Sequence, residues 1–219
     1  MVSTEQEMAA VKQFAFASYI LTPPLVVIAL YTGFVGANIE PIPIVLLGVL
    51  QLFFASLHWV LLKKFRNPIA VHDYTWTHTI VTLLVMTAAI HYTGGIVSPF
   101  SWLYLLSILL EIMLLTPQKG VKVAFLSIVL YSALILTEFF GIIRNPSATV
   151  NGFFPYSDAV FVFSHLFGNI VLITIATFLM GVLKIQVQDR ETELQSLVEN
   201  VQQEEAQTRK LLEQALKKK

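Results

Sequence analysis

Residues 170–183 read IVLITIATFLMGVL and contain no charged side chain. Residues 45–55, VLLGVLQLFFA, form a second stretch of the same kind. A helix on the surface of a soluble protein keeps a polar face towards water, and neither stretch would have one. These two stretches therefore argue against a water-soluble helical bundle and predict helices that are surrounded by lipid.

The composition of the whole chain agrees with this prediction. Charged residues make up 13% of the 219 residues, whereas about a quarter is usual in soluble domains. The acids and bases are concentrated after Lys184, so the chain divides into an apolar body and a water-soluble tail. The absence of cysteine excludes disulfides, thiolate metal sites and thiol redox chemistry.

A membrane helix needs roughly 20 mostly apolar residues, and six segments meet this requirement: 13–36, 42–62, 75–93, 100–116, 121–143 and 160–183. Lysine and arginine gather at one set of segment ends, which the positive-inside rule places in the cytoplasm. Only Arg144 lies at the opposite ends; the others are Lys12, Lys63, Lys64, Arg66, Lys119, Lys122 and Lys184. We therefore predict an all-α membrane protein with both termini in the cytoplasm. Its parts are a cytoplasmic segment 1–12, a six-helix membrane domain 13–184 and a cytoplasmic helix 185–219.

The tail carries an imperfect heptad pattern without glycine or proline. Apolar or small residues recur every seven positions, at Val187, Leu194, Val201, Thr208 and Ala215. The alternating position holds Leu197 and Leu211, but also Arg190 and Glu204. This pattern predicts a parallel homodimeric coiled coil, with a single solvated helix as the alternative.

Several functions are disfavoured by what the sequence lacks. All five histidines precede residue 166 and no glycine follows Gly181, so the tail holds neither a phosphoacceptor histidine nor a glycine-rich nucleotide loop. We expect this chain to have no enzymatic activity of its own. Its expected partners are membrane lipid and a second copy of the chain, and no nucleic acid.

Ionisable side chains within membrane spans are costly and point to function. Three of them lie towards the predicted inner side: His58, His78 and Glu111. Three more lie towards the outer side: His91, Glu138 and His165. They are compatible with hydrogen bonds between helices, with proton or redox coupling to a reducible ligand, or with bis-histidine haem. No further feature supports haem.

Residues 91–100, HYTGGIVSPF, form a polar turn between the third and fourth predicted spans. Gly94 and Gly95 permit positive φ angles and a close approach of a flat ligand to the backbone. Ser98 suits the N-cap of the fourth span, whose free N–H groups would face a ligand carbonyl. We therefore predict a ligand site formed by His91, Tyr92, Gly94, Gly95, Ser98, Pro99, Phe100, Glu138 and His165. The alternative is a helix turn without a ligand.

GGIVSPF in this position resembles the membrane domain of RegB/PrrB-type redox-sensing histidine kinases, whose turn reads Gly-Gly-x-x-Asn-Pro-Phe and is associated with ubiquinone. It is also similar to PilS-type sensor kinases, in which the turn reads Gly-Gly-x-x-Ser-Pro. Gly94, Gly95, Pro99 and Phe100 match the first motif, and Ser98 stands where that motif has asparagine. The resemblance implies a quinone as the ligand, and a kinase domain or response regulator as the signalling partner. Because this chain contains no kinase, either it stops short of one or it acts through another protein.

The sequence thus predicts the membrane input module of a two-component sensor kinase, responding to a lipid-borne or redox signal through a dimeric helix. Two alternatives remain. One is a small quinone- or haem-binding redox subunit, and the other is a membrane scaffold that recruits a partner through its coiled coil.

Overall fold

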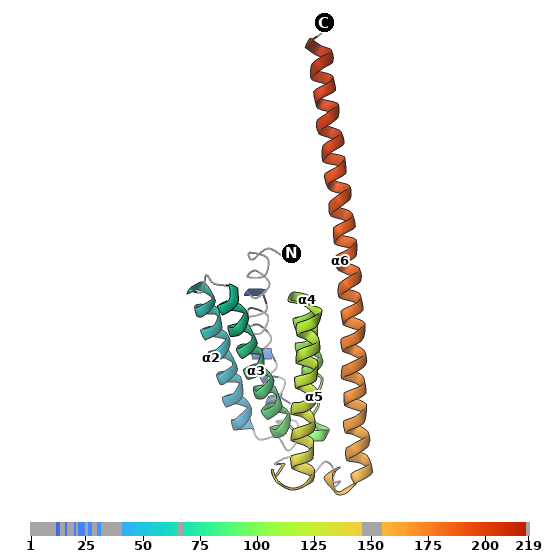
Figure 1. Cartoon of the computed structure of the whole chain (residues 1–219). Coiled ribbons are helices and arrows are strands. Elements are labelled where there is room, and N and C mark those ends of the chain that lie inside the picture. The colour runs from blue at the N-terminus through green and yellow to red at the C-terminus, as the bar shows by residue number, and fades with distance from the viewer. Residues whose placement is uncertain are drawn as a thin grey trace. The chain divides into compact units, whose positions relative to one another are not determined.

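The fold was obtained as a computed structural model and is all-helical over the part of the chain that it describes (Figure 1). The described residues are 12–13, 16, 20, 22–24, 26–27, 30–31, 41–64, 68–145 and 155–217. The helices are α2 (Pro41–Lys64), α3 (Pro68–Tyr92), α4 (Leu103–Leu114), α5 (Pro117–Phe139) and α6 (Ala159–Lys217), with short 3₁₀ helices η1 (Gly95–Val97) and η2 (Pro155–Ser157). The predicted first span, 13–36, falls largely outside the described residues, as does the middle of the loop before η2.

Three of the described helices are long and apolar enough to cross a membrane. They are Ile42–Leu61 within α2, Pro117–Phe139 of α5, and α6 within Ala159–Thr208. Their outward faces carry large apolar side chains, among them Phe125 and Phe178, which are each 69% exposed. An apolar surface on long helices is characteristic of a membrane protein, and this coarse prediction is confirmed.

Helices α3 and α4 differ from the predicted spans. Helix α3 begins at Pro68, before the predicted residue 75. Helix α4 has 12 residues and begins at Leu103, so the predicted span 100–116 was too long at both ends. At about 1.5 Å per residue, α4 is roughly 18 Å long, which is shorter than a hydrocarbon core of about 30 Å. The reason is that residues 95–102 are held in a 3₁₀ helix and turns by bonds such as Ser98 N–H to Gly95 O (3.1 Å).

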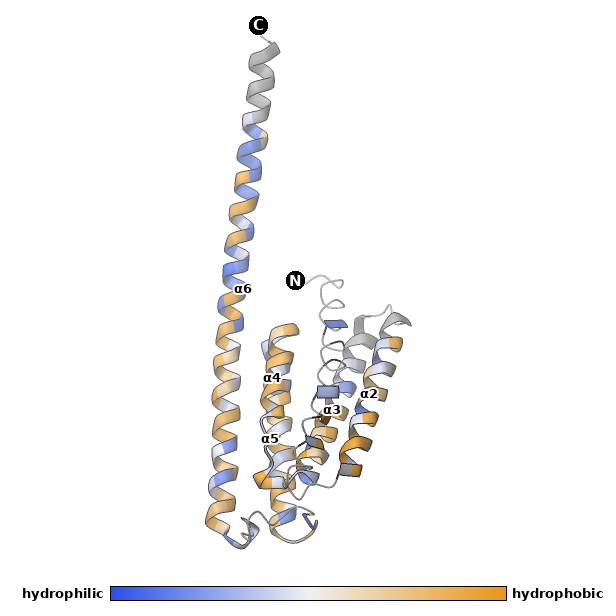
Figure 2. Cartoon of the chain, turned by 180° about the vertical axis from the view of Figure 1, so that it is seen from behind, coloured by the Kyte–Doolittle hydropathy of each residue, from blue (hydrophilic) through white to orange (hydrophobic). Residues whose placement is uncertain are grey.

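Helix α3 is central to the packing of residues 41–180, because it contacts α2, α4 and α5. The core between these helices contains apolar side chains such as Ile90, Tyr104 and Ile135, each no more than 1% exposed. Many polar side chains are buried with them, including Thr79, Ser127 and Glu138. In Figure 2, the ribbons of α2, α4 and α5 are coloured mainly as hydrophobic along their length. This arrangement, apolar towards lipid and polar between helices, is expected when the solvent is hydrocarbon.

The helix ends near the turn regions are fixed by local hydrogen bonds. Thr116 caps α5 by accepting from Lys119 N–H at 3.2 Å, and Pro117 occupies its first turn. Asp158 Oδ1 accepts from Val160 N–H at 2.9 Å at the start of α6. Helix α5 ends before Gly141, whose φ of +70° is the left-handed conformation typical of a residue after a helix C-terminus. These caps fix where the loop before α6 begins and ends.

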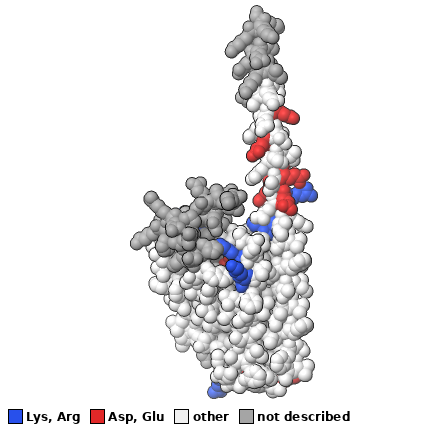
Figure 3. Space-filling view, in the orientation of Figure 1, with Lys and Arg blue, Asp and Glu red and all other residues white. Residues whose placement is uncertain are grey.

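Helix α6 is continuous from Ala159 to Lys217, and it is shared between two compact units that divide after Met180. Within the second unit, large apolar side chains of the heptad pattern are exposed, including Leu194 at 62% and Val201 at 63%. Among the residues coloured in Figure 3, charged side chains are few on the described residues up to Met180 and frequent on the following part of α6. The apolar residues therefore form an uncovered stripe on an otherwise polar helix.

Candidate functional site

The turn between α3 and α4 has the backbone conformation that its glycines predict. Gly94 has φ +119° and Gly95 has φ +58°, both in the region that favours glycine. The prediction that Ser98 is the N-cap of α4 is wrong, because that helix begins only at Leu103 and its N-cap is Trp102. Instead, the Ser98 hydroxyl accepts from Phe100 N–H at 3.2 Å and lies 2.6 Å from the Thr93 hydroxyl. The Ser98 side chain therefore stabilises the turn through hydrogen bonds within residues 93–100.

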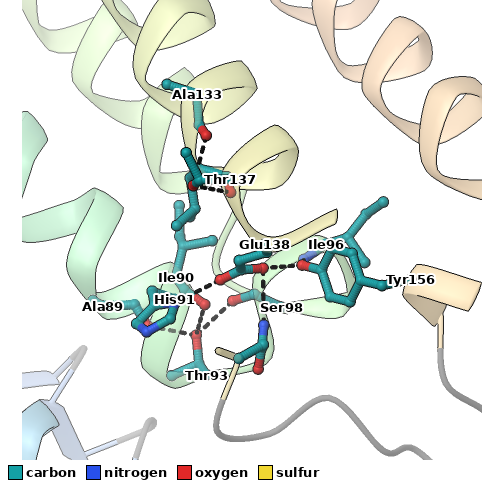
Figure 4. Close-up of polar contacts among 12 residues, drawn as sticks. Ala89, Ile90, His91, Thr93, Ile96, Ser98, Ala133, Thr137, Glu138 and Tyr156 are labelled. Carbon is teal, nitrogen blue, oxygen red and sulfur yellow. Dashed lines mark hydrogen bonds and ion pairs between the residues drawn. The ribbon is translucent and has the colours of Figure 1, made fainter. Parts of the chain in front are cut away.

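A buried carboxylate joins this turn to α5 and to the loop before α6 (Figure 4). Glu138 Oε1 lies 2.5 Å from His91 Nδ1. Its other oxygen accepts hydrogen bonds from Asn145 Nδ2, at 2.9 Å, and from the Tyr156 hydroxyl. We call His91, Glu138, Asn145 and Tyr156 the Glu138 cluster. It ties together residues of α3, α5 and η2.

Gly95 is in direct contact with the Glu138 cluster. A Cβ atom at this position would overlap Glu138 Oε2, the Tyr156 hydroxyl and Asn145 Nδ2. The Tyr156 hydroxyl also accepts a hydrogen bond from the neighbouring Ile96 N–H at 2.9 Å. The close approach predicted at Gly95 is therefore made by side chains of the protein itself.

Tyr156 stays a hydrogen-bond donor over a wide pH range. Burial raises the pKa of its phenol above the ordinary value, and the hydrogen bond to Glu138 raises that pKa further. A neutral phenol can donate to the carboxylate and accept from a backbone amide at the same time. Tyr156 thus connects the backbone of the turn to the Glu138 carboxylate through two hydrogen bonds.

Sequence reasoning missed Asn145 and Tyr156. Both lie in the long loop between the fifth and sixth predicted spans, and Tyr156 meets Ile96 across 60 residues of sequence. No periodicity connects such distant positions. The one available signal was the concentration of polar residues in this loop, among them those in NPS (145–147) and PYSD (155–158).

The other predicted site residues lie outside the cluster. Tyr92 is half-buried, and its ring centre is 4.9 Å from that of His91. Pro99 is exposed, whereas Phe100 is buried. His165 Nδ1 lies 3.0 Å from Asn169 Nδ2 on α6, whereas the hydrogen bonds of Glu138 go to His91, Asn145 and Tyr156. His165 therefore belongs to a second polar group that reaches Tyr131 through Asn169 at 3.5 Å.

An apolar cavity of about 100 Å³ lies between α2, α3 and α4, next to the turn. Thr93 and Phe100, which flank the two glycines, form part of its wall. The remaining lining is mostly aliphatic: Thr22, Val26, Ile44, Leu47, Gly48, Gln51, Thr82, Val85, Met86, Ala89, Leu103, Leu106, Ser107 and Leu110. Its mostly aliphatic lining suits a small apolar molecule.

The three residues of the predicted inner group divide into two sites. The rings of His58 and His78 pack against each other between α2 and α3, with centres 4.3 Å apart. Glu111 Oε1 instead accepts from the Thr79 hydroxyl at 2.5 Å. Glu111 lines a separate cavity of about 150 Å³ together with Thr75, Trp76, Thr79, Lys119 and Lys122. Within the described part of the chain, no group of three or more His, Asp or Glu side chains is arranged to hold a metal ion.

The arrangement around the turn can hold a proton or a charge within a buried network and can contain an apolar molecule beside it. Comparisons with known proteins find no matching family model, no matching curated protein and no matching solved structure.

Proposed function

We propose that this chain is the six-helix input module of a sensor histidine kinase of the bacterial inner membrane. In this proposal it responds to a lipid-borne molecule or its redox state, with a quinone as the candidate implied by the GGIVSPF resemblance. The response passes through a parallel dimer of α6 to a kinase domain or partner protein in the cytoplasm. Both termini lie on the cytoplasmic side.

One observation carries this proposal: α6 continues without a break from an apolar span into a heptad-patterned tail. Leu194, Leu197 and Val201 are each more than half exposed on that tail. A helix that stayed single in water would gain nothing from such a stripe, whereas a second copy would bury it. Because both copies are held in one membrane, the entropic cost of their association is reduced.

The site offers a physical route from a ligand to α6. A molecule in the apolar cavity would touch Thr93 and Phe100, on either side of the two glycines. The turn is bonded through Tyr156 to the loop before α6 and through Glu138 to α5. A ligand shifts such a system only if it binds one packing of these helices better than the other. We propose that the turn has two such packings.

The absence of cysteine makes a direct test of the dimer possible. A Val201→Cys variant places a thiol in the heptad seam, and Ala206→Cys places one on the opposite face of the same helix. In isolated membranes treated with copper–phenanthroline as the oxidant, we expect rapid disulfide formation between copies of Val201→Cys and little between copies of Ala206→Cys. Equal yields from the two variants, or none from either, would refute the parallel dimer and with it the relay.

The two alternatives predict different results. A redox subunit without a relay would need no seam, so it predicts no preference for Val201 over Ala206. A scaffold would show the seam, but its cross-linking would not respond to any small molecule in the membrane.

A further inference from the structure

The apolar cavity contains one polar atom that has no partner among the described residues. Gln51, on α2, lines the cavity and is 6% exposed. Its Nε2 donates to the Thr82 hydroxyl on α3 at 2.9 Å. Its Oε1 is fully buried and makes no hydrogen bond. An acceptor left in this state within apolar surroundings is strongly unfavourable unless a ligand or water satisfies it.

Two hydroxyl groups in the cavity wall, those of Thr93 and Ser107, already have hydrogen-bond partners in the protein. The Thr93 hydroxyl bonds within the turn, and the Ser107 hydroxyl donates to Met86 Sδ at 3.3 Å. A buried water needs two to four polar partners, and this mostly aliphatic wall is poor in them. At about 100 Å³, the cavity is about two-thirds the size of an apolar cavity of about 150 Å³ that accepts benzene, so its occupant is at most a small ring. A ring-sized occupant with one donor group therefore fits better than water alone.

We infer that this cavity is a binding site for a lipid-soluble alcohol or phenol whose hydroxyl donates to Gln51 Oε1. The inference rests on the proposed function, because it names the chemical class of the ligand for that input module. The hydroxyl satisfies the buried acceptor, and the apolar body of the ligand fills the space between α2, α3 and α4. A reduced, hydroxyl-bearing ring would meet this requirement, whereas an apolar molecule without a donor would leave Oε1 unpaired.

The test uses two fluorinated probes of similar size, 4-fluorophenol and 4-fluorotoluene, of which only the first has a donor. Binding to the full chain in detergent micelles is followed by ¹⁹F NMR, and the signal of protein-free micelles is subtracted. We expect the wild type to bind 4-fluorophenol about tenfold more tightly than Gln51→Leu does, as one lost hydrogen bond implies. The affinity for 4-fluorotoluene should be nearly the same in both proteins.

A matched variant locates the site. Ala89→Leu leaves Gln51 in place but fills the cavity, so it should lower the affinity for both probes to a similar extent. Unchanged 4-fluorophenol binding in Ala89→Leu would overturn the inference, because binding would then occur elsewhere. If Gln51→Leu does not fold, the wild type alone decides: equal affinity for the two probes overturns the inference.

The two proposals fail separately. If Val201→Cys cross-links but 4-fluorophenol is not preferred, the proposed ligand class is wrong and the dimer relay still stands. If 4-fluorophenol is preferred but Val201→Cys does not cross-link, the dimer relay is wrong and the ligand site still stands.

Discussion

Replacing Gly95 with alanine should destabilise the helical body more than any other single glycine-to-alanine change near the turn. The new Cβ would overlap three polar atoms of the Glu138 cluster. It would also force an alanine to keep φ near +58°. Two separate costs therefore act at one position.

The magnitude follows from these two costs. A non-glycine residue in the left-handed region is less stable by about 1–2 kcal/mol. Moving Glu138, Asn145 or Tyr156 aside removes at least one hydrogen bond to a charged, buried group, which is worth about 1.5–3 kcal/mol. We expect Gly95→Ala to lower the free energy of unfolding by roughly 2.5–5 kcal/mol.

Gly141→Ala is the matched control. Gly141 has a similar φ of +70°, but a Cβ there meets no atom within 4 Å, so only the backbone cost of about 1–2 kcal/mol applies. Both variants can be compared by SDS titration in mild detergent, followed by the fluorescence of the three tryptophans. Equal destabilisation by the two variants would show that the Glu138 cluster does not occupy the space above Gly95, and the account of the turn would be wrong.

Three further predictions concern the cluster and the topology. Tyr156→Phe should lower stability by about 1–3 kcal/mol. The difference in the free energy of unfolding between the wild type and this variant should be constant below about pH 9 and shrink above about pH 10. The reason is that the phenol of the wild type ionises in the unfolded state, whereas its raised pKa keeps it protonated in the folded state. A difference that grows above pH 10 in unfolding titrations would contradict this. Glu138→Gln should also lower stability by about 1–3 kcal/mol, since its amide would meet donors of the cluster, and unchanged thermal unfolding would disprove it. A membrane-impermeant thiol reagent added to intact cells should label Arg144→Cys but not Ser196→Cys, and the reverse pattern would invert the topology.

The sequence was sufficient where one stretch determines its own structure. Gly94 and Gly95 predicted the positive φ angles of the turn, and the charge-free residues 170–183 predicted a long apolar helix that continues into the tail. It was insufficient where distant segments meet. The contact of Tyr156 with Ile96, and of Asn145 with Glu138, depends on how α5 and the following loop fold back on the turn.

The start of α4 shows a different limit. The serine–proline pair at residues 98–99 is typical of a helix N-terminus, but Ser98 uses its hydroxyl within the turn and delays the helix to Leu103. Likewise, His165 was grouped with Glu138 by its depth alone. Its neighbour Asn169, one helical turn away, provides its hydrogen bond instead.

The central claim is that the state of a membrane-borne molecule changes the packing of α6 against its copy. The most direct measurement is the distance between spin labels attached at Ala206→Cys in lipid nanodiscs containing no quinone, ubiquinone or its reduced form. We expect one inter-helix distance distribution that shifts between the oxidised and reduced samples. Identical distributions in all three samples, or no measurable distance between labels, would contradict it.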